Sequence, residues 1–341
     1  MSQKRIYPDV PLDYSLKNIV NYSARDMDTI SVYPNTYHEI GQRSEQQDAF
    51  YRRIIGETSL LWDPEMNNFY TTEDSMDSLG CGPEVAIGVF DGHGKAGAEA
   101  ALAAKALVSM ALVSDRYYMY RKYVGGDRRV GSDLTGRGVD YPVGSVLSNS
   151  DLVYLYLSNI DKLGFDSREE SDRVLDDSGT TATVAIIKPF EDELTVHQIG
   201  DSAAVWIPSS GDEPTLLAPM HDLTNPEEVE RTVGRGLAKA DDNYFYNLHN
   251  GKGMMLSRSL GDNELLFNSQ KIDTYTYSLR KLGAGSLVLA TDGLWGRDNK
   301  YMEGYTSYIQ DAGLERGLSA AVKSSLHHVY DNVTATGVKV Y

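Results

Sequence analysis

The chain has 341 residues, with 49 acidic and 32 basic side chains and a formal net charge of −17. Such an acidic protein repels phosphate backbones and anionic membrane surfaces, so we expect no nucleic-acid partner. One cysteine excludes an internal disulfide, and no run approaches the roughly 18 to 20 apolar residues of a membrane span. The chain also shows no targeting signal, which predicts a reducing compartment, cytoplasmic or nuclear.

The order of strand-like and helix-like runs predicts one large domain. Residues 1–40 are rich in tyrosine and irregular, and we expect 1–36 to be an N-terminal extension and 37–341 a single catalytic domain. Insertions are predicted near 62–83 and 121–146, where turn-forming residues gather. Apolar alternation and β-branched residues predict strands at Ala49–Ile55, Val85–Phe90, Thr181–Ile187, Glu193–Ile199, Ala203–Ile207, Ser286–Ala290 and Val333–Val340. Helical spacing predicts helices at Gly97–Val113, Pro226–Val233 and Leu318–Tyr330.

The stretch "VAIGVFDGHGKAGAEAA" reads as a strand, a glycine turn and a helix, and it allows two interpretations. Gly92, Gly94 and Gly97 form a G-x-G-x-x-G pattern, which is typical of dinucleotide binding, and Asp115 stands where a ribose-binding acid would. The other interpretation makes Asp91 a metal ligand. The lack of an alternating series of strands and helices after this unit disfavours the dinucleotide interpretation.

Five aspartates stand at the ends of predicted strands. Asp91, Asp201 and Asp292 each follow a strand, whereas Asp48 and Asp331 each precede one. Antiparallel neighbours bring the start of one strand beside the end of the next, so these carboxylates can share one sheet edge. Crowded negative charge costs free energy unless cations neutralise it, which predicts divalent metal ions with hard oxygen ligands.

The chain resembles the metal-dependent protein serine/threonine phosphatases, the protein phosphatase 2C family. The resemblance is carried by ordered blocks that cover most of the chain: "GQRSEQQDAF", "VFDGHGKAGAEAA", "SGTTATVAII", "VHQIGDSAAVW", "HDLTNPEEVERTVGRG", "LSRSLGDNEL", "LVLATDGLW" and "DNVTATGVKVY". It implies an α+β fold, a sandwich of two antiparallel β-sheets flanked by helices in α-β-β-α layers. A dinuclear metal cleft is expected at one edge.

The resemblance also implies a set of metal-binding residues. Asp91 would bridge two Mg²⁺ or Mn²⁺ ions, Gly92 would offer its backbone carbonyl, and Asp292 and Asp331 would complete the shell of the other ion. Asp48 stands at the family's acidic position near the metals, and Asp201 matches a ligand of a third, weaker ion.

Two further residues would act on the substrate. Arg43 matches the phosphate-binding arginine, and His93 matches the histidine that protonates the leaving alkoxide, a task that suits imidazole near neutral pH. The implied activity is hydrolysis of phosphoserine and phosphothreonine in proteins by metal-activated water, without a phospho-enzyme. We expect the protein to act as a monomer.

Three positions depart from the family pattern. Gln47 replaces a common glutamate, Ala203 a common arginine, and Gly296 a repeated aspartate, which puts the third metal ion in doubt. Gly296 motivates the alternative of a pseudophosphatase scaffold. We expect Asp262 to be a structural hydrogen-bond acceptor, with support of the metal site as the alternative, and His221 and Asp222 to stabilise the following helix.

Overall fold

The computed structural model describes residues 32–39, 47–55, 60–63, 68–71, 84–113, 153–154, 157, 177–296, 301–327 and 331–341. Arg43, Cys81, Asp115 and the predicted insertion at 121–146 lie outside these residues.

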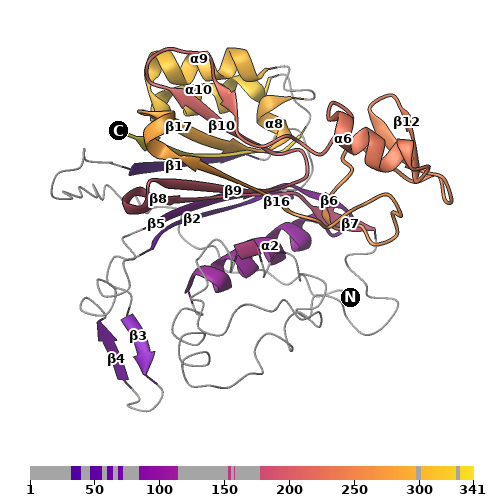
Figure 1. Cartoon of the computed structure of the whole chain (residues 1–341), viewed down its shortest axis with the longest axis horizontal. Helices are drawn as coiled ribbons and strands as arrows, with labels where there is room; N and C mark the ends of the chain where they lie inside the picture. Colours follow the sequence, from indigo (N-terminus) through magenta and orange to yellow (C-terminus); the bar gives the residue numbers. More distant parts are fainter. Residues whose placement is uncertain are drawn as a thin grey trace, which may run out of the picture.

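Two five-stranded sheets pack face to face, and every neighbouring pair of their strands is antiparallel (Figure 1). The upper sheet in that view has the order β1 (Val32–Glu39), β18 (Val333–Val340), β17 (Gly285–Ala290), β10 (Ala203–Pro208) and β11 (Thr215–Leu216). The lower sheet has the order β16 (Asp273–Ser278), β9 (Glu193–Ile199), β8 (Ala182–Lys188), β5 (Glu84–Phe90) and β2 (Ala49–Ile55).

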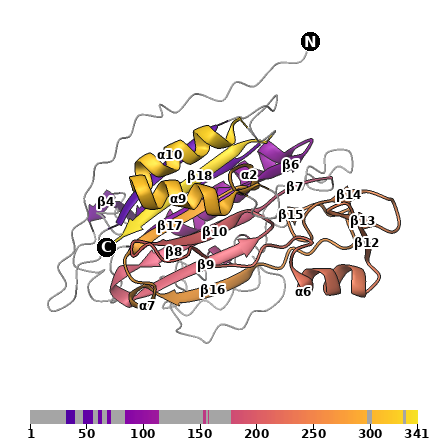
Figure 2. The same cartoon turned by 90° about the horizontal axis from the view of Figure 1, so that it is seen from above.

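Helices cover the two outer faces of this sandwich. Helix α2 (Gly97–Val113) lies under the lower sheet, and α9 (Met302–Ala312) and α10 (Leu314–Ser325) lie over the upper sheet (Figures 1 and 2). The short helices α7 (Leu279–Leu282) and α8 (Asp292–Trp295) follow β16 and β17. The α-β-β-α architecture expected from the family resemblance is confirmed.

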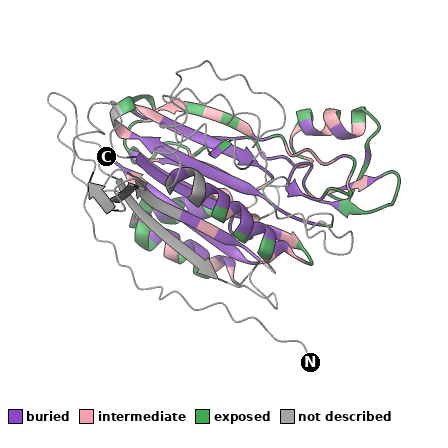
Figure 3. Ribbon diagram, turned by 90° about the horizontal axis from the view of Figure 1, so that it is seen from below, coloured by how far each residue is buried: buried purple, intermediate pink, exposed green. Residues whose placement is uncertain are grey.

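Strand β5 shows why this sequence forms an inner layer. All seven of its residues are buried, because one face meets the opposite sheet and the other meets α2 (Figure 3). Ile87 and Val89 join Trp206 in the core between the sheets, whereas Ala86 and Phe90 pack in the cluster that contains the α2 alanines. Burial of one Val or Ile side chain contributes about 1.5 to 3 kcal/mol, so the near-continuous apolar run holds both interfaces together.

Smaller elements surround the sandwich. A projecting segment, residues 226–254, has its own small core around Phe245 and lies beside one end of the sheets (Figure 1). It contains α6 (Pro226–Val229), the π-helix η5 (Glu230–Gly234), β12 (Ala238–Asp241), β13 (Tyr244–Asn247) and β14 (Gly253–Met254). The remaining elements are the hairpin β3 (Leu60–Asp63) and β4 (Asn68–Thr71), the 3₁₀ turn η4 (Pro189–Glu191), and a third sheet of β15 (Leu260–Gly261), β7 (Ser178–Thr180) and β6 (Gly92–Gly94).

Most of the predicted strands are confirmed to within one residue, but two predictions differ from the structure. Residues 32–39 were expected to be irregular and instead form β1, which pairs with β18 along its whole length. The late helix begins at Leu314 rather than Leu318, and α9 was not predicted. The β3–β4 hairpin lies partly within the predicted insertion near 62–83, and that insertion stays a prediction. The division into an extension, 1–36, and a domain, 37–341, stays a prediction.

The dinucleotide interpretation is wrong, because β5 pairs antiparallel with both of its neighbours and does not belong to a parallel sheet. None of the helices in the described ranges is long and apolar enough to cross a bilayer.

Candidate metal-binding and catalytic site

Strand pairing brings Asp48 and Asp91 together in the lower sheet. Ala49, the first residue of β2, is paired with Phe90, the last residue of β5, so the aspartates just outside the two strands are neighbours. The charge of Asp48 contributes to the raised pKa of Asp91, so the two carboxyl groups lie within electrostatic range of each other.

The upper sheet contributes Asp292 and Asp331 in the same way. Strand β17 ends where β18 begins, and the Thr291 N–H donates to the Thr334 carbonyl at 3.0 Å. Thr291 then links the two sheets, because its hydroxyl donates to Asp48 Oδ2 at 3.1 Å. The predicted meeting of strand-end aspartates therefore takes place, with two from each sheet.

Two glycines permit this close approach. A Cβ at Gly293 would lie 1.8 Å from the Asn332 carbonyl oxygen, next to Asp331. A Cβ at Gly92 would lie 2.1 Å from the Gly97 carbonyl oxygen and 2.5 Å from that of Gln47. The glycine pattern after β5 therefore serves backbone packing at this edge.

The electrostatics of the four carboxylates show how crowded they are. Burial raises the pKa of Asp48 to about 7, and the charges of Asp292 and Asp331 add to this effect. Burial, followed by the charges of Asp48 and Asp292, also raises the pKa of Asp91 well above its usual range. We call Asp48, Asp91, Asp201, Asp292 and Asp331 together the acidic edge.

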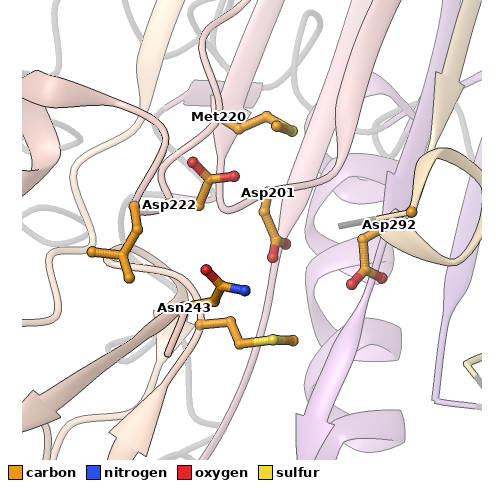
Figure 4. A pocket seen from close by; sticks show the side chains of 8 residues that line it. Asp201, Met220, Asp222, Asn243 and Asp292 are labelled. Carbon is orange, nitrogen blue, oxygen red and sulfur yellow. The ribbon is translucent and has the colours of Figure 1, made fainter. Parts of the chain in front are cut away.

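Asp201 joins this edge from the turn between β9 and β10. Burial and the neighbouring charges of Asp292 and Asp222 raise its pKa to about 8. Asp201 and Asp292 extend toward one cavity, whose other side includes Asp222 and Asn243 from the direction of the projecting segment (Figure 4). The cavity wall also contains Met220, Leu223, Met255 and Gly296.

His221 binds the backbone of the turn that contains Asp201. The Gly200 N–H donates to His221 Nδ1 at 3.0 Å, and His221 Nε2 lies 3.3 Å from Asp273 Oδ2. Asp222 accepts hydrogen bonds from the Thr224 N–H and hydroxyl. Both residues thus make local structural contacts, although Asp222 also faces the cavity.

The donor set at this edge fits hard divalent cations, because carboxylate and carbonyl oxygens are the ligands that Mg²⁺ and Mn²⁺ prefer. Across the described part of the chain, no three histidine, cysteine, aspartate or glutamate side chains are grouped closely enough to hold one ion as they stand. The crowding of these carboxylates at one edge, rather than a finished coordination shell, makes this edge the candidate metal-binding site.

His93 lies beside the acidic edge, in strand β6. Its Nε2 is 2.5 Å from Asp262 Oδ2, and its side chain keeps 26% of its surface exposed. Burial lowers the pKa of His93, but the charges of Asp262, Asp201 and Asp292 outweigh burial and raise it above the usual value. The ring is therefore predisposed to carry the extra proton that a general acid donates.

The three departures from the family pattern have structural settings. Gln47 donates from Nε2 to the Gly94 carbonyl at 3.0 Å, a bond that an ionised glutamate would not donate. Ala203 is fully buried in β10. Gly296 has a φ of +71°, and a Cβ there would lie 2.5 Å from the Tyr301 ring. A family aspartate at 296 would therefore need a different turn.

Sequence reasoning underestimated Asp262 and missed Asn332. Asp262 was expected to accept structural hydrogen bonds, yet it also contacts His93. Asn332 Oδ1 accepts from the Gln47 N–H at 2.9 Å and ties the start of β2 to the start of β18. In the sequence, Asp262 is marked only by the "GD" at the end of β15, and Asn332 only by being a second polar residue beside Asp331.

Comparison with known proteins finds phosphatases among the similar sequences and folds. Residues 146–298 match the family model Protein phosphatase 2C. With 153 of 341 residues matched, the chain is similar to this family over a little less than half of its length. Similar curated proteins include Probable protein phosphatase 2C 61 of Arabidopsis thaliana, 31% identical over 130 residues that cover 35% of this chain and 39% of that protein. Probable protein phosphatase 2C 33 of Oryza sativa subsp. japonica is 31% identical over 125 residues, which cover 35% of this chain and 28% of the relative. The chain thus spans less than two fifths of these protein phosphatase 2C relatives.

Solved serine/threonine phosphatase structures share the fold over most of the chain. A serine-threonine phosphatase 2C from Toxoplasma gondii matches with a TM-score of 0.57 and 17% identity, covering 95% of this chain and 98% of that one. The catalytic domain of the phosphatase PstP, in complex with two manganese ions, matches with a TM-score of 0.50 and 17% identity, covering 92% and 99%.

Proposed function

We propose that this protein is a metal-dependent serine/threonine protein phosphatase that hydrolyses phosphoserine and phosphothreonine without a phospho-enzyme. The observation that carries the proposal is the acidic edge, where carboxylates from both sheets meet beside His93 in a fold shared with a solved serine-threonine phosphatase 2C. Burial and like charge raise the pKa values of Asp48, Asp91 and Asp201 there. Such an edge is costly for a protein that does not bind cations.

Asp91, Asp292, Asp331 and the Gly92 carbonyl would hold two Mg²⁺ or Mn²⁺ ions, with Asp48 close by. Asp201 would serve a weaker third ion. Bound divalent cations supply the positive charge that acidifies an attacking water and stabilises the transferring phosphoryl group. The similarity to PstP, which was solved with two manganese ions, supports this metal count.

His93 would give its proton to the serine or threonine oxygen as the bond to phosphorus breaks. Arg43, which lies outside the described residues, would bind two phosphoryl oxygens with its planar guanidinium. We further propose that the protein acts as a monomer on phosphoproteins of the cytoplasm or nucleus; its single cysteine fits a reducing compartment.

A pseudophosphatase is disfavoured, because a scaffold has no physical need to maintain a cluster of mutually repelling carboxylates. The pseudophosphatase alternative is motivated by Gly296 alone. The missing aspartate at this position affects the part of the acidic edge that is assigned to the weaker third ion.

The test is phosphate release from a phosphothreonine peptide and from para-nitrophenyl phosphate, with and without Mn²⁺. Asp292→Asn should lower the Mn²⁺-dependent rate by at least about a hundredfold, because it removes a ligand that two-metal hydrolysis needs. Asp241→Asn is the matched control, since Asp241 is exposed and pairs with Lys239 on the projecting segment. Equal rates for the two variants would overturn the site assignment, and no release by the unmodified protein would overturn the proposed function.

A further inference from the structure

Asp262 and His93 meet across a single glycine of the small third sheet. In that sheet Gly179 of β7 is paired with His93 of β6 on one side and with Gly261 of β15 on the other. Asp262 is the residue that follows Gly261 in the chain. A Cβ at Gly179 would lie 2.2 Å from Asp262 Oδ2 and 2.9 Å from His93 Nε2. The bare backbone at this position is therefore what allows the two side chains to come within 2.5 Å.

Asp262 makes several hydrogen bonds to the protein and is more buried than His93. Its N–H donates to the Ser178 carbonyl at 3.0 Å, the Ser259 hydroxyl donates to its Oδ2, and its carbonyl accepts from the Leu265 N–H at 3.0 Å. Its side chain is 5% exposed, against 26% for His93, and its backbone adopts a left-handed φ of +51°. Aspartate and asparagine tolerate this conformation better than most residues, which fits a carboxylate fixed in one place.

The two ring nitrogens of His93 are consequently in different situations. Nε2 faces Asp262, while Nδ1 has no hydrogen-bond partner among the residues that the structure describes. A carboxylate on one imidazole nitrogen holds the proton there, and it thereby selects the other nitrogen for exchange with a substrate.

We propose that Asp262 is the positioning residue of His93: it keeps a proton on Nε2 and turns Nδ1 toward the leaving oxygen of the substrate. This inference rests on the proposed phosphatase function. A water oxygen forms the new bond to phosphorus and releases its proton to solvent, while the bond from phosphorus to the serine or threonine oxygen breaks. The Nδ1 proton passes to that oxygen, and the neutral ring keeps its Nε2–H on Asp262 until Nδ1 is protonated again from solvent.

The test is the leaving-group dependence of Asp262→Asn, which keeps the size and the left-handed preference of residue 262. A general acid contributes about 10² to 10⁴ in rate for a poor leaving group, so we expect a loss of about a hundredfold on a phosphothreonine peptide. On para-nitrophenyl phosphate, whose leaving group needs no proton, the expected loss is under about fivefold. His93→Ala and the double variant should match each other, because the two residues act as one unit.

Asp273→Asn is the matched control, because it removes another carboxylate that contacts a histidine, His221, outside the proposed reacting centre. It should leave the ratio of the two substrate rates unchanged. Equal losses by Asp262→Asn on both substrates, or losses that multiply with those of His93→Ala, would overturn the positioning role.

Nitrogen-15 NMR of His93 provides a readout that does not depend on turnover. In neutral His93 the unmodified protein should carry the proton on Nε2, and Asp262→Asn should shift protons toward Nδ1. An unchanged tautomer would contradict the inference. Absence of phosphate release with the expected tautomer would instead reject the phosphatase function while leaving the His93–Asp262 geometry in place.

Discussion

Two regions of this molecule bury carboxylates in opposite ways. At the base of the projecting segment, Glu228 is almost fully buried and binds Arg258 and Arg231, and Arg258 in turn binds Asp273. We call these four residues together with His221 the charged network. At the acidic edge, by contrast, carboxylates from both sheets face one another.

Their pKa values move in opposite directions. Burial alone would raise the pKa of Glu228, but hydrogen bonds from Arg258, Ser257 and Arg231 outweigh it and lower the value to about 2. The hydrogen bond with His221 likewise lowers the pKa of Asp273. Burial and like charge instead raise the pKa of Asp48 to about 7 and that of Asp201 to about 8. The charged network therefore has its counter-charges within the chain, whereas under the proposed function bound cations would supply those of the acidic edge.

Breaking the charged network should produce the largest loss of stability. Glu228→Gln leaves Arg258 and Arg231 without their buried counter-charge, which we expect to cost about 3 to 5 kcal/mol in the free energy of unfolding. Glu264→Gln is the matched control, because its ion pair with Lys252 is about half exposed and should contribute under about 1 kcal/mol. Urea unfolding of both variants measures the difference. Similar losses would show that burial does not distinguish these pairs.

The two regions should also respond oppositely to pH. The raised pKa values of Asp48 and Asp201 mean that the metal-free folded protein binds more protons than the unfolded chain between about pH 4 and pH 8. Stability from these groups therefore falls as the pH rises through this window. The lowered pKa of Glu228 contributes stability above its unfolded pKa of about 4.5, and this contribution is lost only as the pH falls toward 2.

Thermal unfolding of the metal-free protein measures this response. The melting temperature should fall between about pH 5.5 and pH 8, and Mn²⁺ should raise it more at the higher value, where the carboxylates are ionised. In Asp48→Asn the fall should be smaller. A melting temperature that rises over this interval without metal would contradict the assigned repulsion.

The smallest expected effect concerns the missing family aspartate. Gly296→Asp adds a carboxylate near the cavity, but the left-handed backbone and the Tyr301 ring resist it, at a cost of about 1 to 3 kcal/mol. We expect Mn²⁺ affinity to change less than about threefold, because a Cβ at this position meets the Tyr301 ring. Gly304→Asp is the control, since a Cβ there meets nothing within 4 Å. A tenfold gain in affinity would show that the turn adapts.

The acidic edge could be predicted because its aspartates stand next to strand ends, and a strand end is visible in the sequence where an apolar or β-branched run stops. Asp91 after β5 and Asp292 after β17 are examples. The contact between Asp262 and His93 could not be predicted in this way, because it depends on the register of three very short strands around Gly179. Strand β1 escaped prediction since its tyrosine, asparagine and proline lack apolar alternation, and only its pairing with β18 makes it a strand.

The charged network was also hidden. Glu228 and Arg231 are neighbours along one helical turn, but Arg258 and Asp273 come from separate loops and strands that meet beneath the projecting segment. Charged residues of this kind look like solvent-exposed positions in the sequence, because burial of an ion pair leaves no local pattern.

Calorimetric titration of the metal-free protein with Mn²⁺, beside Asp91→Asn, measures whether the acidic edge binds cations. We expect binding of about two ions with release of protons at neutral pH, because carboxyl groups with raised pKa values must ionise to bind metal. Asp91→Asn should lose most of this binding while unfolding at a higher temperature than the metal-free parent. No binding at millimolar Mn²⁺ by the unmodified protein, or equal binding by the variant, would contradict the assignment of the acidic edge as the metal site.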